Sequence, residues 1–215
     1  ARRPVRPSVP RRRGVHVEAR AWARSIESKD PYTLGHCERV ADYACAIFRE
    51  VDTNEGALFW FRMGALLHDV GKINVPTEVL NKPGKLTPEE RALMESHPVA
   101  GVELLKDVEF PWDVLPMVRS HHERWDGKGY PDRLTGEAIP LHARVLALAD
   151  VFDALTTDRP YRPAFSPEEA LRMMRVDMHG AFDPSLFPIF ERLVPSFQGF
   201  AAAAGRRAEV KQAAA

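Results

Sequence analysis

The apolar residues of this chain recur at intervals of three and four over most of its length. One series runs His36, Val40, Ala44, Ile47 and Val51, an inward-facing stripe that has a histidine as its first member. Helical spacing continues through "NEGALFWFRMGALLHD", "EERALMESH", "VAGVELLKDV", "WDVLPMVRSHHE" and "LHARVLALADVFDALTT". No alternating run of β-branched and aromatic residues interrupts it. The pattern predicts an all-α fold.

Two helix starts carry capping boxes. Thr87 is followed by Glu90 in "TPEE", and Ser166 by Glu169 in "SPEE". In both, a proline occupies the first helical position, where its missing N–H costs nothing. The sequence therefore predicts the first residues of two helices.

The length of 215 residues suits one domain with a single core. Residues 1–14, "ARRPVRPSVPRRRG", are expected to be a disordered Arg/Pro-rich linker, with a basic arm for nucleic acid as the alternative. Residues 15–198 form the expected compact domain, and residues 199–215 a low-complexity tail. Because the chain begins with Ala1, we expect a piece of a longer protein with a regulatory domain upstream.

Charge and cysteine content narrow the class of protein. Thirty basic and thirty acidic residues leave no net field, which argues against a nucleic-acid polymer as partner. No apolar stretch reaches the roughly 18 residues of a membrane span. Cys37 and Cys45 lie about 12 Å apart along one predicted helix and cannot form a disulfide there. These features predict a cytoplasmic protein.

Histidines and aspartates occur inside or at the ends of apolar helices, where solvated side chains are not expected. Asp69 follows "MGALLH" and Asp150 follows "RVLALA". A buried carboxylate must be paired or must bind a metal, because leaving it bare costs several kcal/mol. The residues of this kind are His36, His68, Asp69, His97, His121, His122 and Asp150.

Each of these residues also has a simpler explanation. His36 could be an interior histidine held by hydrogen bonds, and His97 could end a helix. Asp69 could cap the turn at "DVGK", with the glycine in a positive-φ conformation. Asp150 could pair with Arg144. The simpler explanations would have to hold separately for each of the seven residues, whereas one polynuclear metal site accounts for all seven.

The ligand types restrict the metal and the chemistry. Histidine and carboxylate without thiolate suit Fe, Mn, Co, Ni or Zn, and exclude a structural cysteine-zinc site. An aspartate can bridge two ions, and two ions about 3.5–4 Å apart can clamp both oxygens of an in-line phosphoryl displacement. The residues thus indicate hydrolysis of a phosphate ester.

Two motifs resemble a known family. "HDVGK", from His68 to Lys72, resembles the signature of the HD superfamily of metal-dependent phosphohydrolases, and "HHERWDGKGYP" resembles the hallmark of its HD-GYP branch. The resemblance extends from about Ile26 to Val194 through "DPYTLGHCERVA", "MESHPVAGVELL", "HARVLALADVFDALTTDRPYR" and "GAFDPSLF". It implies a compact helical domain with a central metal site. Proteins of this branch hydrolyse cyclic di-GMP to the linear dinucleotide pGpG or to GMP, and some prefer cyclic GMP-AMP.

The resemblance assigns metal ligation to the same seven residues, with Asp69 as the bridge. Members with three metals carry a glutamate four residues before the first histidine, where this chain has Tyr32. A phenol is a poor ligand at neutral pH because its pKa is near 10. We therefore predict two divalent ions, Fe or Mn first, with Zn, Ni or Co as alternatives.

The resemblance also assigns substrate contacts. Lys72 would place an ammonium on the scissile phosphate, and Asp153 would orient the attacking hydroxide. Tyr130 would contact the ligand, and Arg159 and Arg162 would bind phosphate and guanine. Arg159 and Arg162 could instead be solvated charges on a loop. Lys72 could instead cap the end of its helix electrostatically.

The sequence thus predicts a cyclic di-GMP phosphodiesterase. A phosphodiesterase for cyclic GMP-AMP, a receptor or scaffold that binds the nucleotide without hydrolysis, and an HD-type nucleotidase are the alternatives. A homodimer is compatible with an enzyme and with a receptor.

Overall fold

The computed structural model describes residues 35–158 and 162–197. Within these ranges every regular element is a helix, apart from one isolated β-bridge between Asp126 and Thr135, so the all-α prediction is confirmed. The α-helices are α2 (His36–Phe48), α3 (Glu55–Leu67), α4 (Thr77–Leu80), α5 (Pro88–Glu95), α6 (His97–Leu105), α7 (Val114–Ser120), α8 (Leu141–Thr156) and α9 (Pro167–Val176). Two 3-10 helices, η2 (Val70–Asn74) and η3 (Gly136–Ala138), and a last helical segment over residues 187–197 complete the fold. The predicted linker 1–14 and tail 199–215 lie outside the described residues.

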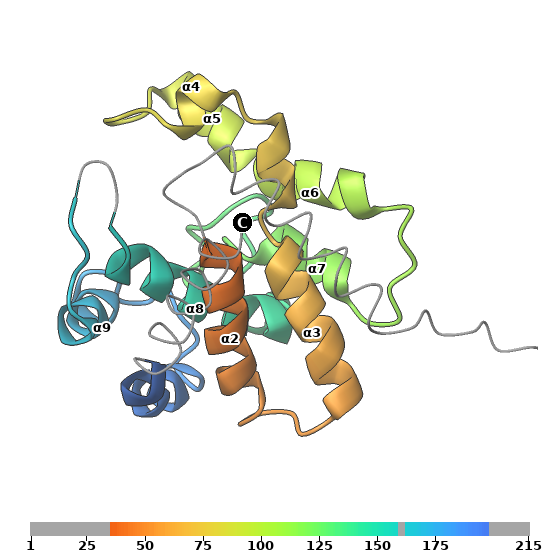
Figure 1. The fold of residues 1–215 in the computed structure, drawn as a ribbon, viewed down its shortest axis with the longest axis vertical. Coiled ribbons are helices and arrows are strands. Elements are labelled where there is room, and N and C mark those ends of the chain that lie inside the picture. Colours follow the sequence, from red (N-terminus) through yellow and green to blue (C-terminus); the bar gives the residue numbers. More distant parts are fainter. Residues whose placement is uncertain (1–34, 159–161, 198–215) are drawn as a thin grey trace, which may run out of the picture.

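Helix α2 lies at the centre of the packing. It runs beside α3 and also contacts α8 (Figure 1). Helix α3 packs on α7, and α6 packs on both α7 and η2. The core side chains between these helices are fully buried and include Phe48, Met63, Leu66, Leu146 and Phe190. This arrangement brings the ends of α2, α3, α6 and α7 toward the same part of α8.

The helix starts follow the predicted chemistry. Both capping boxes form: the hydroxyl of Thr87 accepts from the amide of Glu90, and that of Ser166 accepts from the amide of Glu169. Prolines occupy the first turn in each case. Cys37 and Cys45 are buried on α2 and do not form a disulfide with each other, as the sequence predicts. Across the described ranges, no helix combines the length and apolar character that crossing a membrane requires.

Two details differ from the sequence prediction. Helix α2 ends at Phe48, so Val51 lies beyond the inward stripe and is 36% exposed. The glycine of "DVGK", Gly71, is not in a positive-φ turn but within the 3-10 helix η2. It is needed for close approach: a Cβ there would overlap the carbonyl oxygen of His97 and lie 2.5 Å from the nitrogen of Gly101. Gly71 therefore lets η2 pack directly on α6.

Candidate metal centre

The predicted ligands come from the ends of several helices and converge. His36 and His97 are the first residues of α2 and α6, and His68 and His121 are the C-caps of α3 and α7. Their neighbours in sequence and one residue inside α8 complete the set: Asp69, His122 and Asp150. Because most of these residues lie at helix ends, their polar side chains can meet one another while the apolar side chains between the helices stay buried.

Asp69 lies at the centre of the cluster. Its Oδ2 is 3.4 Å from Nε2 of His68 and 3.8 Å from Nε2 of His36. Its Oδ1 is 3.3 Å from Nε2 of His97 and 3.9 Å from Nε2 of His121. The two oxygens of one carboxylate thus face two different sets of histidines.

The donor atoms form two groups that share Asp69. One contains His36, His68 and Asp69, and the other contains Asp69, His97, His121 and His122; within each group the donors lie within 4.8 Å of one another. Oδ1 of Asp150 extends the first group, at 3.2 Å from Nε2 of His36 and 3.9 Å from Nε2 of His68. We call His36, His68 and Asp150 the α2–α8 half, and His97, His121 and His122 the α6–α7 half.

Three histidines are oriented by backbone carbonyls close to them in the sequence. In each, Nδ1 lies 2.7 Å from the carbonyl oxygen three residues earlier, the pairs being His68 with Ala65, His97 with Met94 and His121 with Val118. Because a carbonyl oxygen only accepts, Nδ1 carries the hydrogen. Nε2 then offers its lone pair to the cluster, as a metal ligand requires.

His36 is oriented differently. Its Nδ1 lies 2.7 Å from Oδ2 of Asp153, which is 1% exposed. Arg39 donates to both oxygens of that carboxylate. The sequence assigned Asp153 to an attacking hydroxide, but the structure places it against the ring nitrogen of His36 that points away from Asp69 and Asp150.

The α6–α7 half is built from neutral histidines. Burial disfavours the charged imidazolium and lowers the pKa of His97 to about 4 and that of His122 to about 3. The pKa of His121 falls well below its ordinary value, first through burial and then through repulsion from neighbouring histidines. At neutral pH no proton has to leave these rings before a cation binds.

The α2–α8 half is more charged. Burial acts to lower the pKa of His36, but hydrogen bonds to Asp150 and Asp153 outweigh it and raise the pKa to about 9. Burial acts to raise the pKa of Asp69, yet the Lys72 ammonium and the nearby histidines hold it well below its usual range. Nζ of Lys72 is 2.6 Å from Oδ2 of Asp69. The carboxylates here are ionised.

Two buried atoms in the cluster lack hydrogen-bond partners among the described residues. They are Nε2 of His68, which faces Oδ2 of Asp69, and Oδ1 of Asp69 itself. A buried polar atom left unsatisfied costs about 1–3 kcal/mol. A lone pair on nitrogen and a carboxylate oxygen are both ligands for a divalent cation, so the residues fit a metal centre.

Of the other predicted site residues, the structure places one beside the cluster and one at the end of α8. The Tyr130 ring stacks on His122, with centroids 4.8 Å apart. Arg162 donates to backbone carbonyls at the end of α8 and at Pro163, and its guanidinium lies over the Phe165 ring. Arg159 lies outside the described residues, as does Tyr32, on which the choice of two metals over three depends.

The sequence reasoning missed Glu123. This carboxylate is buried and accepts from the amides of Asp132, at 2.7 Å, and Leu134, at 3.0 Å. It therefore ties the loop that carries Tyr130 to the residue directly after His122. Its position inside "HHERWDGKGYP" was the available signal, because an acidic residue next to a buried histidine pair needs donors of its own.

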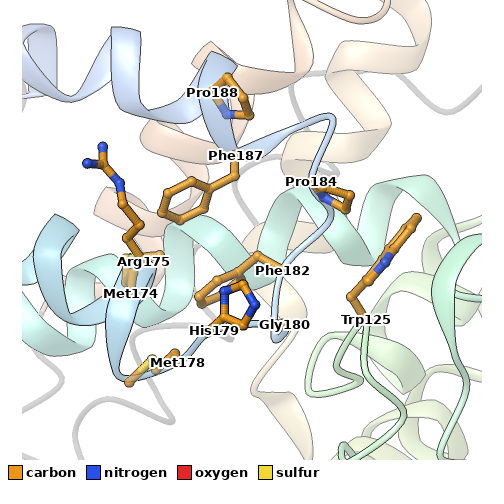
Figure 2. Close-up of a pocket in the computed structure, with 10 residues that line it drawn as sticks. All are labelled: Trp125, Met174, Arg175, Met178, His179, Gly180, Phe182, Pro184, Phe187 and Pro188. Atoms are coloured by element: carbon orange, nitrogen blue, oxygen red, sulfur yellow. The ribbon is translucent and has the colours of Figure 1, made fainter.

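An apolar pocket lies behind the same loop. It encloses about 290 Å³ and is lined mainly by aromatic, methionine and proline side chains (Figure 2). Trp125 forms part of its wall and is half-buried, with the guanidinium of Arg144 over its ring. Arg144 pairs with Asp183 at 2.7 Å, so its suggested pairing with Asp150 is wrong. None of the predicted ligands lines this pocket.

Comparison with known proteins identifies the family. The HD domain family model matches residues 20–186. The 3′3′-cGAMP-specific phosphodiesterase 3 of Vibrio cholerae serotype O1 is 39% identical over 173 residues, which cover 80% of this chain and 37% of that protein. The cyclic di-GMP phosphodiesterase response regulator RpfG of Xanthomonas campestris is 44% identical over 164 residues, 75% of this chain and 43% of that protein. The chain thus spans about two fifths of these relatives.

Solved structures share the fold. An HDG"Y"P protein from Bdellovibrio bacteriovorus aligns with a TM-score of 0.65 and 19% identity, over 86% of this chain and 65% of that one. The HD domain of the L. monocytogenes phosphodiesterase PgpH, solved in complex with cyclic-di-AMP, aligns with a TM-score of 0.57 and 19% identity, over 84% of this chain and 96% of that one. The chain belongs to the HD domain family, and within it to the HD-GYP branch that its motifs resemble.

Proposed function

We propose that this chain is a metal-dependent phosphodiesterase domain that hydrolyses cyclic di-GMP to the linear dinucleotide pGpG, and onward to GMP where the site permits. The observation that carries the proposal is the shared carboxylate: the two oxygens of Asp69 face separate groups of histidines. Relatives whose names specify cyclic dinucleotides as substrates support the choice of substrate class.

Two divalent ions are proposed, with Fe or Mn favoured and Zn, Ni or Co as alternatives. The α2–α8 half and Asp69 would hold one ion, and the α6–α7 half and Asp69 the other. When bound, such a pair lowers the pKa of a water molecule and neutralises phosphate charge.

The chain's own residues would bind and orient the substrate. Lys72 lies beside Asp69 and is only partly exposed, so its ammonium can donate to a phosphate oxygen at the cluster. Tyr130, stacked on His122, borders the α6–α7 half and is proposed to contact the nucleotide. Arg159 and Arg162 are proposed phosphate and guanine contacts; Arg162 would have to exchange its bonds to the end of α8 for that role.

The test is metal loading followed by product analysis. Protein loaded anaerobically with Fe²⁺ or Mn²⁺ is expected to bind two equivalents by elemental analysis and to convert cyclic di-GMP to pGpG by chromatography. Chelated protein is the control. Absence of turnover under every metal loading would contradict the enzyme. Tight calorimetric binding of unchanged nucleotide would support the receptor alternative.

A hydrolase of cyclic GMP-AMP is the second candidate, because a relative at 39% identity is specific for that nucleotide. Equal concentrations of both nucleotides in one assay distinguish them by the order in which they disappear. The upstream regulatory domain, the homodimer and the cytoplasmic location expected from the sequence stay predictions.

A further inference from the structure

His36 is held by a different device from that of His68, His97 and His121. Those three donate Nδ1–H to a carbonyl of the preceding helical turn. His36 and His97 each begin a helix; His97 takes its acceptor from Met94 of α5, whereas among the described residues no such carbonyl accepts from Nδ1 of His36. Another group has to fix the ring if Nε2 is to face Asp69 and Asp150.

That group is the carboxylate of Asp153, which reaches across from α8. Its Oδ2 is 2.7 Å from Nδ1 of His36. A carboxylate this deeply buried must itself be held by donors, because an unpaired buried charge is costly. Left with one hydrogen bond, it could rotate and take the imidazole with it.

Arg39 supplies the remaining donors. It lies one turn after His36 on α2 and grips the carboxylate with two groups: Nε is 2.6 Å from Oδ1 and Nη2 is 3.0 Å from Oδ2 of Asp153. Nη2 also lies 3.3 Å from Oγ1 of Thr157, one turn beyond Asp153 on α8. A guanidinium fork on both carboxylate oxygens fixes the plane of the carboxylate, which a single ammonium cannot do.

We propose that Arg39 is a positioning residue of the metal centre: by holding Asp153, it fixes His36 with Nε2 directed into the α2–α8 half. This inference rests on the metal centre proposed above. Arg39 bonds Asp153 and Thr157, which both lie at the α8 side of the centre, so its effect is expected on the ion of the α2–α8 half. Removing outer partners of metal-binding histidines typically lowers affinity about 10- to 100-fold.

A matched control exists in a second Arg–Asp pair that also involves α2. Arg62 of α3 pairs with Asp42 of α2 at 2.7 Å, so it also ties two helices through a partly buried Arg–Asp pair. That pair contains no cluster histidine. A variant that merely loosens helix packing should therefore resemble Arg62→Met, and only a positioning residue should change metal affinity.

The experiment is titration of the metal-free chain with Mn²⁺ alone, followed by elemental analysis, for the parent, Arg39→Met, Arg39→Lys and Arg62→Met. Arg39→Met is expected to bind one equivalent about 10- to 100-fold more weakly and the other as the parent does. Arg39→Lys keeps the charge but loses the fork, and should fall between Arg39→Met and the parent. Arg62→Met should bind both equivalents normally.

Four results would count against the inference. Unchanged affinity for both equivalents in Arg39→Met, or equal losses in Arg39→Met and Arg62→Met, would reject it while leaving the metal centre intact. A parent that binds no Mn²⁺ would reject the metal centre and this inference together. If Arg39→Met does not fold, the result for Arg39→Lys decides, with parent-like affinity counting against the proposal.

Discussion

The two halves of the metal centre differ in charge although they share one carboxylate. The α2–α8 half contains the ionised Asp150 and a histidine, His36, whose pKa is raised to about 9 by its carboxylate partners. The α6–α7 half contains only histidines, and burial lowers the pKa values of His97 and His122 to about 4 and about 3. The first half must release the proton of His36, beside an ionised carboxylate, before a cation binds, whereas the second half offers neutral nitrogen atoms.

The halves also differ in how they are held. Two histidines of the α6–α7 half, His97 and His121, are fixed by backbone carbonyls three residues earlier in the chain, at Met94 of α5 and Val118 of α7. His36 depends on a side chain from α8, more than a hundred residues later in the sequence. Asp69 thus joins a half in which His97 and His121 are held by nearby backbone carbonyls to a half in which only tertiary structure holds His36, so the two halves should respond separately to substitution.

The largest effect is expected from Asp69→Ala, which removes the residue common to both halves. Both ions should be lost together, and hydrolysis of cyclic di-GMP should fall by more than the roughly 100-fold upper range for outer partners. Elemental analysis and a product assay measure the two effects. Asp42→Ala, a helix-surface aspartate paired with Arg62, is the control. Retention of one full equivalent would show that Asp69 is not shared.

His36→Ala and His97→Ala separate the halves. Each should bind one equivalent of Mn²⁺ with parent-like affinity and lose the other, because the remaining donors of the opposite group keep their positions. The double variant should bind none. The comparison fails if either single substitution abolishes both equivalents, since the two groups would then form one indivisible site.

Much of the centre could be predicted from the sequence because its ligands interrupt apolar helices. Asp69 and Asp150 follow runs of apolar residues, and burial of a carboxylate in such a place requires a partner. The capping residues Thr87 and Ser166 were equally readable, since the capping box is a contact within four consecutive residues.

Two features that sequence reasoning missed depend on contacts between residues far apart in the sequence. Arg39 reads as an ordinary helical cation, and only the approach of α8 gives it Asp153 as a partner. The glycine at position 71 suggested a positive-φ turn, which was wrong because its true constraint comes from the backbone of α6, which follows α4 and α5 along the chain. Neither spacing nor propensity encodes such contacts.

Gly71→Ala tests the junction between the halves. The added Cβ would meet backbone atoms of His97 and Gly101, which cannot move aside as a flexible side chain could. Overpacking of this kind should lower the free energy of unfolding by about 1–3 kcal/mol and weaken metal binding in the α6–α7 half. Urea unfolding and Mn²⁺ titration measure both. Gly84→Ala is the control, because nothing lies within 4 Å of its Cβ position; equal stability of the two variants would contradict the close packing.

Glu123→Gln should give the smallest effect and confine it to the loop beside the α6–α7 half. The N–H groups of Asp132 and Leu134 donate to different oxygens of Glu123, so the glutamine amide keeps one of these bonds, loses the other, and no longer carries the charge that strengthens them. A cost of about 1 kcal/mol in the free energy of unfolding follows. Because the loop carries Tyr130, the KM for cyclic di-GMP should rise while both equivalents of Mn²⁺ stay bound. Glu137→Gln, at an exposed position of η3, is the control. Loss of an ion from Glu123→Gln would contradict this prediction. It would mean that the carboxylate supports His122 itself and is part of the metal centre, not only of the loop.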